Sequence, residues 1–223
     1  MTALVMAATL VACSSGGDDE PAAPAGGSGS SSLPDRQPAA AEPVEEAPDG
    51  LGPMEPPPGF TKVTGEGFTL FAPERFTADR RTSSNGEPML VLSADAPAGG
   101  EPPAGGPATT VAVARDVAAG AGVLEQSRAL ESSKRLVDEA TGVRRTIVAW
   151  PGATHAVLVE WTVQEAAAPP SSGTQAVRTV QLGTDVAADL RFAVVATAPA
   201  DSFDDSEVAA ILRTFRPTKA ATT

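Results

Sequence analysis

Side chains able to do chemistry are scarce in this 223-residue chain, which has one histidine and one cysteine. His155 could act as the base of a Ser-His-Asp set, but the sequence lacks the Gly-x-Ser-x-Gly turn that presents such a serine. His155 is also the first residue on the apolar face of a predicted strand, beside a turn. This position favours a partly buried packing or edge histidine. One histidine and one cysteine exclude a His/Cys metal cluster. We therefore predict no catalytic residue, no metal and no cofactor.

An acidic group near the C-terminus has two interpretations; it consists of Asp201, Asp204, Asp205 and Glu207. Calcium needs six or more oxygen ligands, but the spacing does not match the EF-hand loop, which alternates its ligands around a central glycine. Helix capping is the simpler interpretation, with Asp204 as the N-cap and Glu207 three residues later as its capping-box partner. The remaining acids would favour the positive end of the helix dipole. We predict capping.

Glu160 is an isolated carboxylate on an otherwise mild face of a predicted strand. Such a group could be catalytic, or it could pair with a basic residue on a neighbouring strand. The strands predicted on either side of Glu160 carry Arg145 and Arg178. We predict an ordinary cross-strand ion pair with one of these two arginines.

Three aromatic residues are the candidates for ligand recognition. Trp150 and Trp161 are predicted on adjacent strands of one hairpin, and Phe192 lies on a later strand. Flat apolar rings can line a groove for sugars or lipids, but core packing is the simpler interpretation. If a cavity exists between the sheet and a helix, these three rings are predicted to line it.

Cys13 ends a short apolar run, and Leu10, Val11, Ala12 and Cys13 resemble a bacterial lipobox. In proteins with this motif the thiol is alkylated with diacylglycerol, and a signal peptidase then cuts before the cysteine. The apolar run of residues 3–12 has the length of a signal-peptide core and about half the length of a membrane span. We predict a lipoprotein signal peptide at 1–12 and lipidation of Cys13.

Residues 13–59 have the composition of a disordered linker. The segment is rich in proline, glycine, serine and acidic residues, and its only basic residue is Arg36. Such a chain buries too little apolar surface to offset the entropy of ordering. The whole chain carries a net charge of −12 and has no basic stripe, so we expect no nucleic-acid partner. The short tail, 218–223, is also predicted to be disordered.

The region 60–217 has the patterning of one α+β domain. Alternating apolar and polar residues predict strands. A helix over 123–140 is predicted by the helical spacing of Val123, Leu124, Ser127, Leu130 and Val137. Thr141 and Gly142 are predicted to end this helix. One face of strand 154–164 should pack and the other should be largely wet. The sequence predicts loops at 96–107 and 166–173, a turn at 183–185, and a final helix. The predicted strands are 67–73, 89–94, 109–115, 144–150, 154–164, 175–182 and 186–198, and the final helix is 206–215.

The two ends of this region resemble those of the PsbP-like family. The opening stretch is Gly67-Phe68-Thr69-Leu70-Phe71-Ala72-Pro73, and the closing stretch is Ile211-Leu212-Arg213-Thr214-Phe215-Arg216-Pro217. The order of elements between them also fits that family, which includes many actinobacterial surface lipoproteins. The resemblance covers residues 60–217 and implies an α-β-α sandwich with a mostly antiparallel sheet.

The resemblance implies a binding or assembly role without a conserved reaction. We therefore expect a lipoprotein held at the extracytoplasmic face of the cell membrane through lipid on Cys13. Its domain should be a non-catalytic module that binds or scaffolds an envelope protein. The alternative is a carrier with a lipid or other small apolar ligand in a pocket between the sheet and a helix.

Overall fold

The structure is a computed structural model that describes residues 42–48, 50–82, 86–94, 109–116, 120–136, 138, 140–166, 173–187 and 189–218. The predicted signal peptide, Cys13 and most of the predicted linker lie outside these residues. The predicted loop 96–107, most of the predicted loop 166–173 and residues 219–223 also lie outside them. Residues from Pro43 onward belong to one compact unit.

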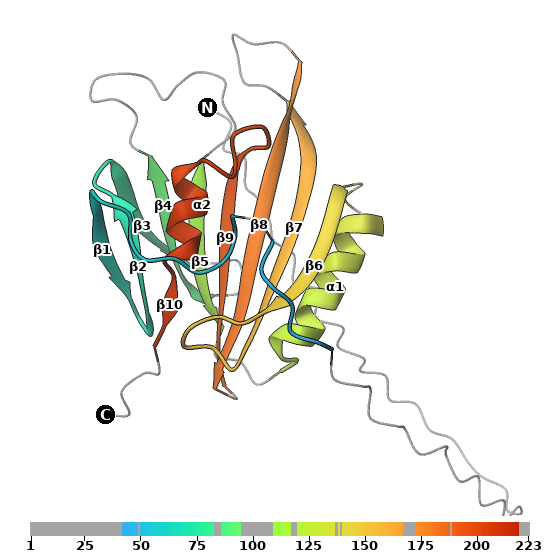
Figure 1. Ribbon diagram of the computed structural model, residues 1–223, viewed down its shortest axis with the longest axis horizontal. Helices are drawn as coiled ribbons and strands as arrows, with labels where there is room; N and C mark the ends of the chain where they lie inside the picture. Colours follow the sequence, from blue (N-terminus) through green and yellow to red (C-terminus); the bar gives the residue numbers. More distant parts are fainter. Residues whose placement is uncertain are drawn as a thin grey trace, which may run out of the picture. The chain divides into compact units, whose positions relative to one another are not determined.

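A seven-stranded sheet forms the centre of this unit, and all its neighbouring strands are antiparallel (Figure 1). Apolar and β-branched residues dominate its central strands, as expected for pleated surfaces that are buried. In spatial order the strands are β3 (Phe76–Thr82), β4 (Pro88–Ala94), β5 (Thr110–Asp116), β9 (Leu190–Pro199), β8 (Thr174–Ala187), β7 (His155–Ala166) and β6 (Thr141–Val148).

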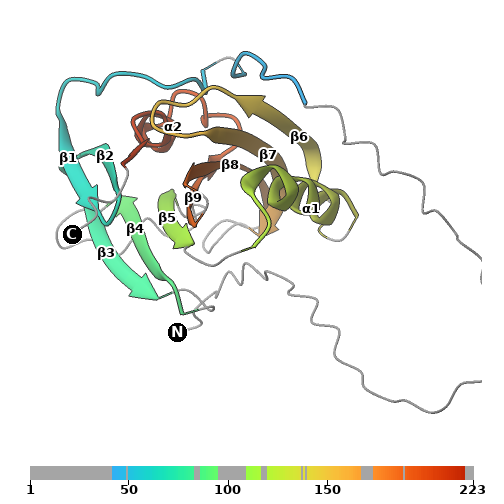
Figure 2. The same ribbon diagram turned by 90° about the horizontal axis from the view of Figure 1, so that it is seen from below.

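Two helices and a small second sheet cover this large sheet. The small sheet contains β1 (Phe60–Gly65), β2 (Phe68–Pro73) and β10 (Arg216–Pro217), in the order β1-β2-β10. Helix α2 (Glu207–Arg213) lies beside it on one side of the large sheet, whereas α1 (Val123–Leu136) lies on the other side (Figure 2). The predicted α+β class with a mostly antiparallel sheet is therefore confirmed, with one helix on each side.

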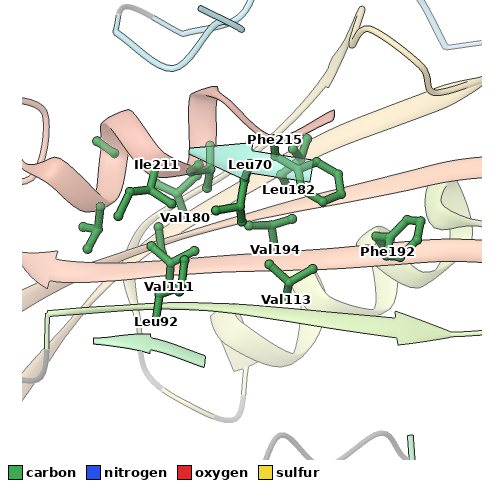
Figure 3. Close-up of a cluster of buried hydrophobic side chains, with 14 of the residues drawn as sticks. Leu70, Leu92, Val111, Val113, Val180, Leu182, Phe192, Val194, Ile211 and Phe215 are labelled. Atoms are coloured by element: carbon green, nitrogen blue, oxygen red, sulfur yellow. The ribbon is translucent and has the colours of Figure 1, made fainter. Parts of the chain in front are cut away.

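The main core fills the space between the large sheet and α2 with its neighbouring small sheet (Figure 3). Among the residues that the structure describes, it contains 27 buried hydrophobic ones. Three of them, Phe68, Phe192 and Phe215, form a triangle of rings with centroids 5.6–5.8 Å apart, within the usual range for aromatic pairs. These rings connect β2 and β9 to the end of the chain, so the two resembling ends of the domain meet in one core.

A second and smaller cluster, here called the α1-face cluster, lies under α1. Its five buried members are Val123, Ile147, Val157, Val159 and Trp161. On β7 these residues alternate with Ala156 and Leu158, which belong to the main core. Because successive side chains of a strand point to opposite faces, the two clusters lie on opposite faces of the sheet. The prediction that one face of this strand is largely wet is wrong, since residues 156–161 are buried on both faces.

The predicted turn at 183–185 is also wrong, because β8 continues through it to Ala187. Gly183 faces the beginning of α1, where a Cβ atom would lie 2.4 Å from Cγ2 of Val123. A glycine inside a strand often marks the close approach of another element. The glycine here makes room for the helix.

Helix α1 ends four residues before its predicted end, at Leu136, and Val137 lies outside the described residues. Thr141 and Gly142 do not cap the helix and instead begin β6. The pairing of β6 with β7 shifts register between Thr141 and Arg144, and Gly142 has a φ of 63°. Gly142 therefore lies at an irregularity in the strand pairing. The sequence pattern alone does not distinguish such a glycine from one that ends a helix.

The folded unit begins before the predicted boundary at residue 60. Residues 43–48 and 50–58, here called the strap, lie along it. Leu51 of the strap is completely buried in the main core. The backbone N–H of Glu45 donates to the carbonyl of Ile147 at 2.7 Å, which makes an isolated parallel bridge to the edge strand β6. This part of the predicted linker is therefore docked on the domain.

Two arginines from the end of the domain hold the strap. The Arg213 Nε atom donates to the carbonyl of Gly52 at 2.8 Å, and an Arg216 Nη2 atom donates to the carbonyl of Met54 at 2.7 Å. Burial lowers the pKa of the Arg216 guanidinium, and the nearby Glu55 carboxylate opposes this shift. The composition of the strap alone predicts disorder. The strap is ordered in the structure because it binds these two arginines, which lie more than 150 residues away in the chain.

Candidate functional site

Trp150 and Phe192 are packing residues of the main core. The Trp150 side chain is 5 % exposed, and its indole Nε1–H donates to the carbonyl of Phe215 at 2.9 Å. Phe192 is 2 % exposed and contacts the rings of Phe68 and Phe215 edge-on. The indole N–H thus has its partner inside the protein, as a buried tryptophan requires.

Trp161 lies on the opposite face of the sheet, in the α1-face cluster. It is 8 % exposed, and the Nζ atom of Lys134 in α1 lies 4.8 Å from its ring centroid. A cation over an indole face is a favourable contact. Because Trp161 is separated by the sheet from Trp150 and Phe192, the three candidate residues do not line one pocket.

Two hollows occur at the surface beside the strap. One, of about 400 Å³, is lined by strap residues and Ala149. The other, of about 230 Å³, lies at the β6–β7 turn and is the one that Trp150 touches, together with Val44 and His155. The first volume lies in the lower part of the range of about 300–1,000 Å³ for small-molecule sites, and the second lies below it. Neither hollow lies between the sheet and α2.

An ionic group on the α2 face, here called the Arg178 group, contains Glu160, Arg178 and Asp204. The Arg178 Nη2 atom donates to Glu160 Oε2 at 2.7 Å, and Nη1 donates to Asp204 Oδ1 at 2.9 Å. The guanidinium also lies 5.0 Å from the centroid of the Phe203 ring. The predicted ion pair of Glu160 with Arg178 is confirmed. The group ties β7 and β8 to the segment before α2.

Arg145, the other predicted partner of Glu160, lies on the opposite face. It stands across from Val159 in the β6–β7 register, so its side chain points to α1. Its Nε atom donates to Ser127 Oγ at 2.8 Å, and an Nη2 atom donates to the carbonyl of Leu124 at 3.3 Å.

The predicted capping box is wrong, because Ser206 and not Asp204 is the N-cap of α2. The Ser206 hydroxyl accepts a hydrogen bond from the backbone N–H of Ala209. Glu207 is the first helical residue, and its carboxylate pairs with Arg75. A serine and an aspartate are almost equal as caps, and in the structure Asp204 instead pairs with Arg178. Glu207 still places an acid in the first turn, as the helix dipole favours.

A second ionic group, here called the Arg191 group, lies on the α1 face and contains Asp116, Asp185 and Arg191. The Arg191 side chain is 5 % exposed; its Nη1 atom donates to Asp116 Oδ2 at 3.3 Å, and its Nε atom lies 3.6 Å from Asp185 Oδ1. Arg191 also donates to the carbonyls of Gly120 and Ala121, just before α1. This group was not predicted from the sequence, although a lone arginine inside an apolar strand is a signal for a buried ion pair.

His155 is the first residue of β7, and its side chain is 55 % exposed. Of the two predicted roles, the structure therefore fits a histidine at the edge of the strand and not a packing residue. Its Nδ1 atom lies 3.6 Å from Asp185 Oδ2. That carboxylate already accepts the N–H of Val123 and faces Arg191. Among the described residues no serine hydroxyl is hydrogen-bonded to His155, so the geometry of a catalytic triad is not assembled there.

The described residues contain no group of three or more His, Cys, Asp or Glu side chains placed to hold a metal ion. None of the described helices has the length and apolar character needed to cross a bilayer. Several of the described acids instead pair with arginines, as in the Arg178 and Arg191 groups.

Comparison with known proteins adds no family to this geometry. No protein-family model matches the chain, and no curated protein is significantly similar to it in sequence. The structure shows the α+β class and the antiparallel sheet, and the PsbP-like resemblance stays a prediction from the two ends of the domain.

Proposed function

We propose that this chain is a lipid-anchored extracytoplasmic protein whose PsbP-like domain binds or scaffolds an envelope protein without chemistry of its own. The observation that carries the proposal is the position of Cys13, the only cysteine in the sequence, at the end of a lipobox-like apolar run. Lipidation would give this thiol a role in an exported chain, where it has no intramolecular disulfide partner.

Because the strap is docked on the domain, the segment between Cys13 and the folded unit is shorter than the predicted linker. Residues 14–42 separate Cys13 from the folded unit, which begins at Pro43. A flexible chain of this length spans about 30 Å, and its proline and acidic residues favour extension. The domain would therefore act in a layer close to the membrane.

The packing of the aromatic candidates supports a binding domain over a carrier. Trp150 and Phe192 are occupied by contacts with other core residues, and Trp161 is covered by Lys134 of α1. A carrier of apolar ligands needs a cavity of several hundred cubic ångströms lined by apolar side chains. The space between the sheet and α2 holds the main core.

Replacement of Cys13 tests the anchor. Cells fed an alkyne analogue of palmitate should label the wild-type chain and a Ser28→Ala control, whereas Cys13→Ser should lose both the label and its place in the membrane fraction. Membrane attachment of Cys13→Ser that survives a high-salt wash would contradict the proposal.

Native mass spectrometry of the wild-type chain, purified from its own host before and after organic extraction, tests the domain's role. The covalent lipid stays on the chain during extraction, so any mass that disappears belongs to a non-covalent ligand. An unchanged mass supports protein binding, and crosslinking in intact cells would then identify the partner. A lost apolar mass would replace the proposal with a carrier.

A further inference from the structure

Helix α1 is attached to the rest of the fold by few apolar contacts. Two of its 14 residues are buried, namely Val123 and Ser127, and Leu136 at its C-terminal end is 82 % exposed. Leu124 and Leu130 are only partly buried. An isolated helix of this length is marginal in water. Its helical state therefore depends on a contact with the sheet that is itself small.

Polar groups make up much of the contact between α1 and the sheet. Arg145 of β6 donates to the Ser127 hydroxyl and to the Leu124 carbonyl, at 2.8 and 3.3 Å. Lys134 covers Trp161. When the helix leaves, water can replace the partners of these polar groups, so each contributes little net free energy to docking.

The N-terminal end of α1 is held by a latch, defined here as Asp185 and Arg191. Both carboxylate oxygens of Asp185 lie 3.2 Å from the backbone N of Val123, so this sheet residue caps the helix from a distance. Arg191 donates to the carbonyl of Ala121 at 2.8 Å and so fixes the segment that enters the helix. Two side chains of the sheet thus determine where α1 begins.

The rest of the fold does not need α1. The main core lies on the opposite face of the sheet, and none of its 27 buried residues belongs to this helix. Loss of α1 would expose the α1-face cluster, of which four residues belong to β6 and β7. The ladder of the seven strands and α2 would keep their contacts.

We propose that α1 is a latched cover that opens as a unit, while the seven-stranded sheet and the main core stay folded. Elements with few buried apolar contacts are the ones that open below the free energy of global unfolding. The opening exposes Trp161 and the apolar side chains around it to water. This inference concerns the described fold and stands independently of the anchor and of the proposed partner.

Hydrogen exchange followed by mass spectrometry tests the opening. The full chain carrying Cys13→Ser is suitable because it has no other thiol. Under native conditions we expect the amides of α1 to exchange about 100-fold faster than those of β8 and β9, relative to their intrinsic rates. Equal protection of α1 and these strands would overturn the proposal.

Substitution in the latch tests what holds the cover. Asp185→Asn keeps the size of the side chain but removes its charge, and we expect about tenfold faster exchange in α1 with little change in β4, which is remote from the latch. Asp204→Asn is the matched control because it removes a carboxylate on the opposite face. An equal effect of the two substitutions on α1 would contradict the latch.

A disulfide provides a reversible lock. A Cβ atom at Gly183 would lie 3.8 Å from the Cβ of Val123, which is close to the usual separation in disulfides. The variant Cys13→Ser, Val123→Cys, Gly183→Cys should therefore close a bond between α1 and β8. When oxidised it should slow α1 exchange at least about tenfold, and reduction should restore the fast rate. Fast exchange of α1 in the oxidised form would overturn opening as a unit.

Discussion

The two faces of the seven-stranded sheet are covered by different kinds of contact. On the α2 face, 27 buried hydrophobic residues from both sheets, α2 and the strap form one cluster. On the α1 face, five buried residues form the cluster, and much of the remaining contact with α1 is ionic or polar. The free energy gained by hydrophobic burial scales with the apolar area removed from water. The stability of the domain therefore resides on the α2 face, and freedom to rearrange resides on the α1 face.

Each face also has its own tryptophan, which makes the comparison measurable. Trp150 is in the main core and donates to the Phe215 carbonyl, whereas Trp161 lies under Lys134 of α1. The chain contains no other tryptophan. Trp161→Phe therefore leaves a reporter of the α2 face, and Trp150→Phe leaves a reporter of the α1 face.

The largest expected effect is on the α2 face, from Phe192→Ala. Phe192 is 2 % exposed and contacts two other rings. Its removal should cost about 3–5 kcal/mol, a large part of the stability of a typical domain. Urea unfolding of the Cys13→Ser chain, followed by circular dichroism, measures this loss. A loss below about 1 kcal/mol would show that the aromatic triangle is not central to the core.

These faces also show how far the sequence alone predicts the fold. Most of the antiparallel strands, α1 and α2 follow from the period of their apolar residues, and the Glu160–Arg178 pair follows from strand neighbours. The strands β1 and β10 were not among the predicted ones. Gly183 and Gly142 were misassigned because a glycine marks a turn, a bulge or a close approach equally well. Only the packed structure decides among these.

The missed parts of the candidate site depend on partners far apart in the chain. Arg191 meets Asp116 across 75 residues, and Arg213 meets Gly52 across 161. Local patterns carry no information about such pairs. For the same reason the sequence predicted one aromatic site, whereas the sheet separates Trp161 from Trp150 and Phe192.

A matched pair of smaller substitutions sharpens the comparison. Val180 and Val157 are both completely buried, on the α2 face and the α1 face respectively. Each change to alanine should cost about 2 kcal/mol, but in different transitions. We expect Val180→Ala to lower the urea midpoint reported by Trp150, and Val157→Ala to lower chiefly the midpoint reported by Trp161. Equal shifts of both reporters by both variants would mean that the two faces unfold together.

We expect the smallest effect from the helix caps, which also differ between the two faces. The cap of α2 is local, since the Ser206 hydroxyl accepts the N–H of Ala209, whereas α1 is capped by Asp185 from another strand. Ser206→Ala should cost about 1 kcal/mol. Because α2 buries four of its seven residues in the main core, this loss should appear in the transition reported by Trp150.

The contribution of the Ser206 hydroxyl to the α2 cap can be separated from that of the acidic charge beside it. Ser206→Thr keeps a hydroxyl acceptor and should restore most of the stability that Ser206→Ala loses. Asp205→Asn changes an acid near the same helix end without removing the cap, and it should shift the midpoint by less than about 0.5 kcal/mol. If Asp205→Asn costs as much as Ser206→Ala, the charge near the helix end, and not the serine hydroxyl, stabilises the start of α2. The local cap would then depend on electrostatics, as the cap of α1 does.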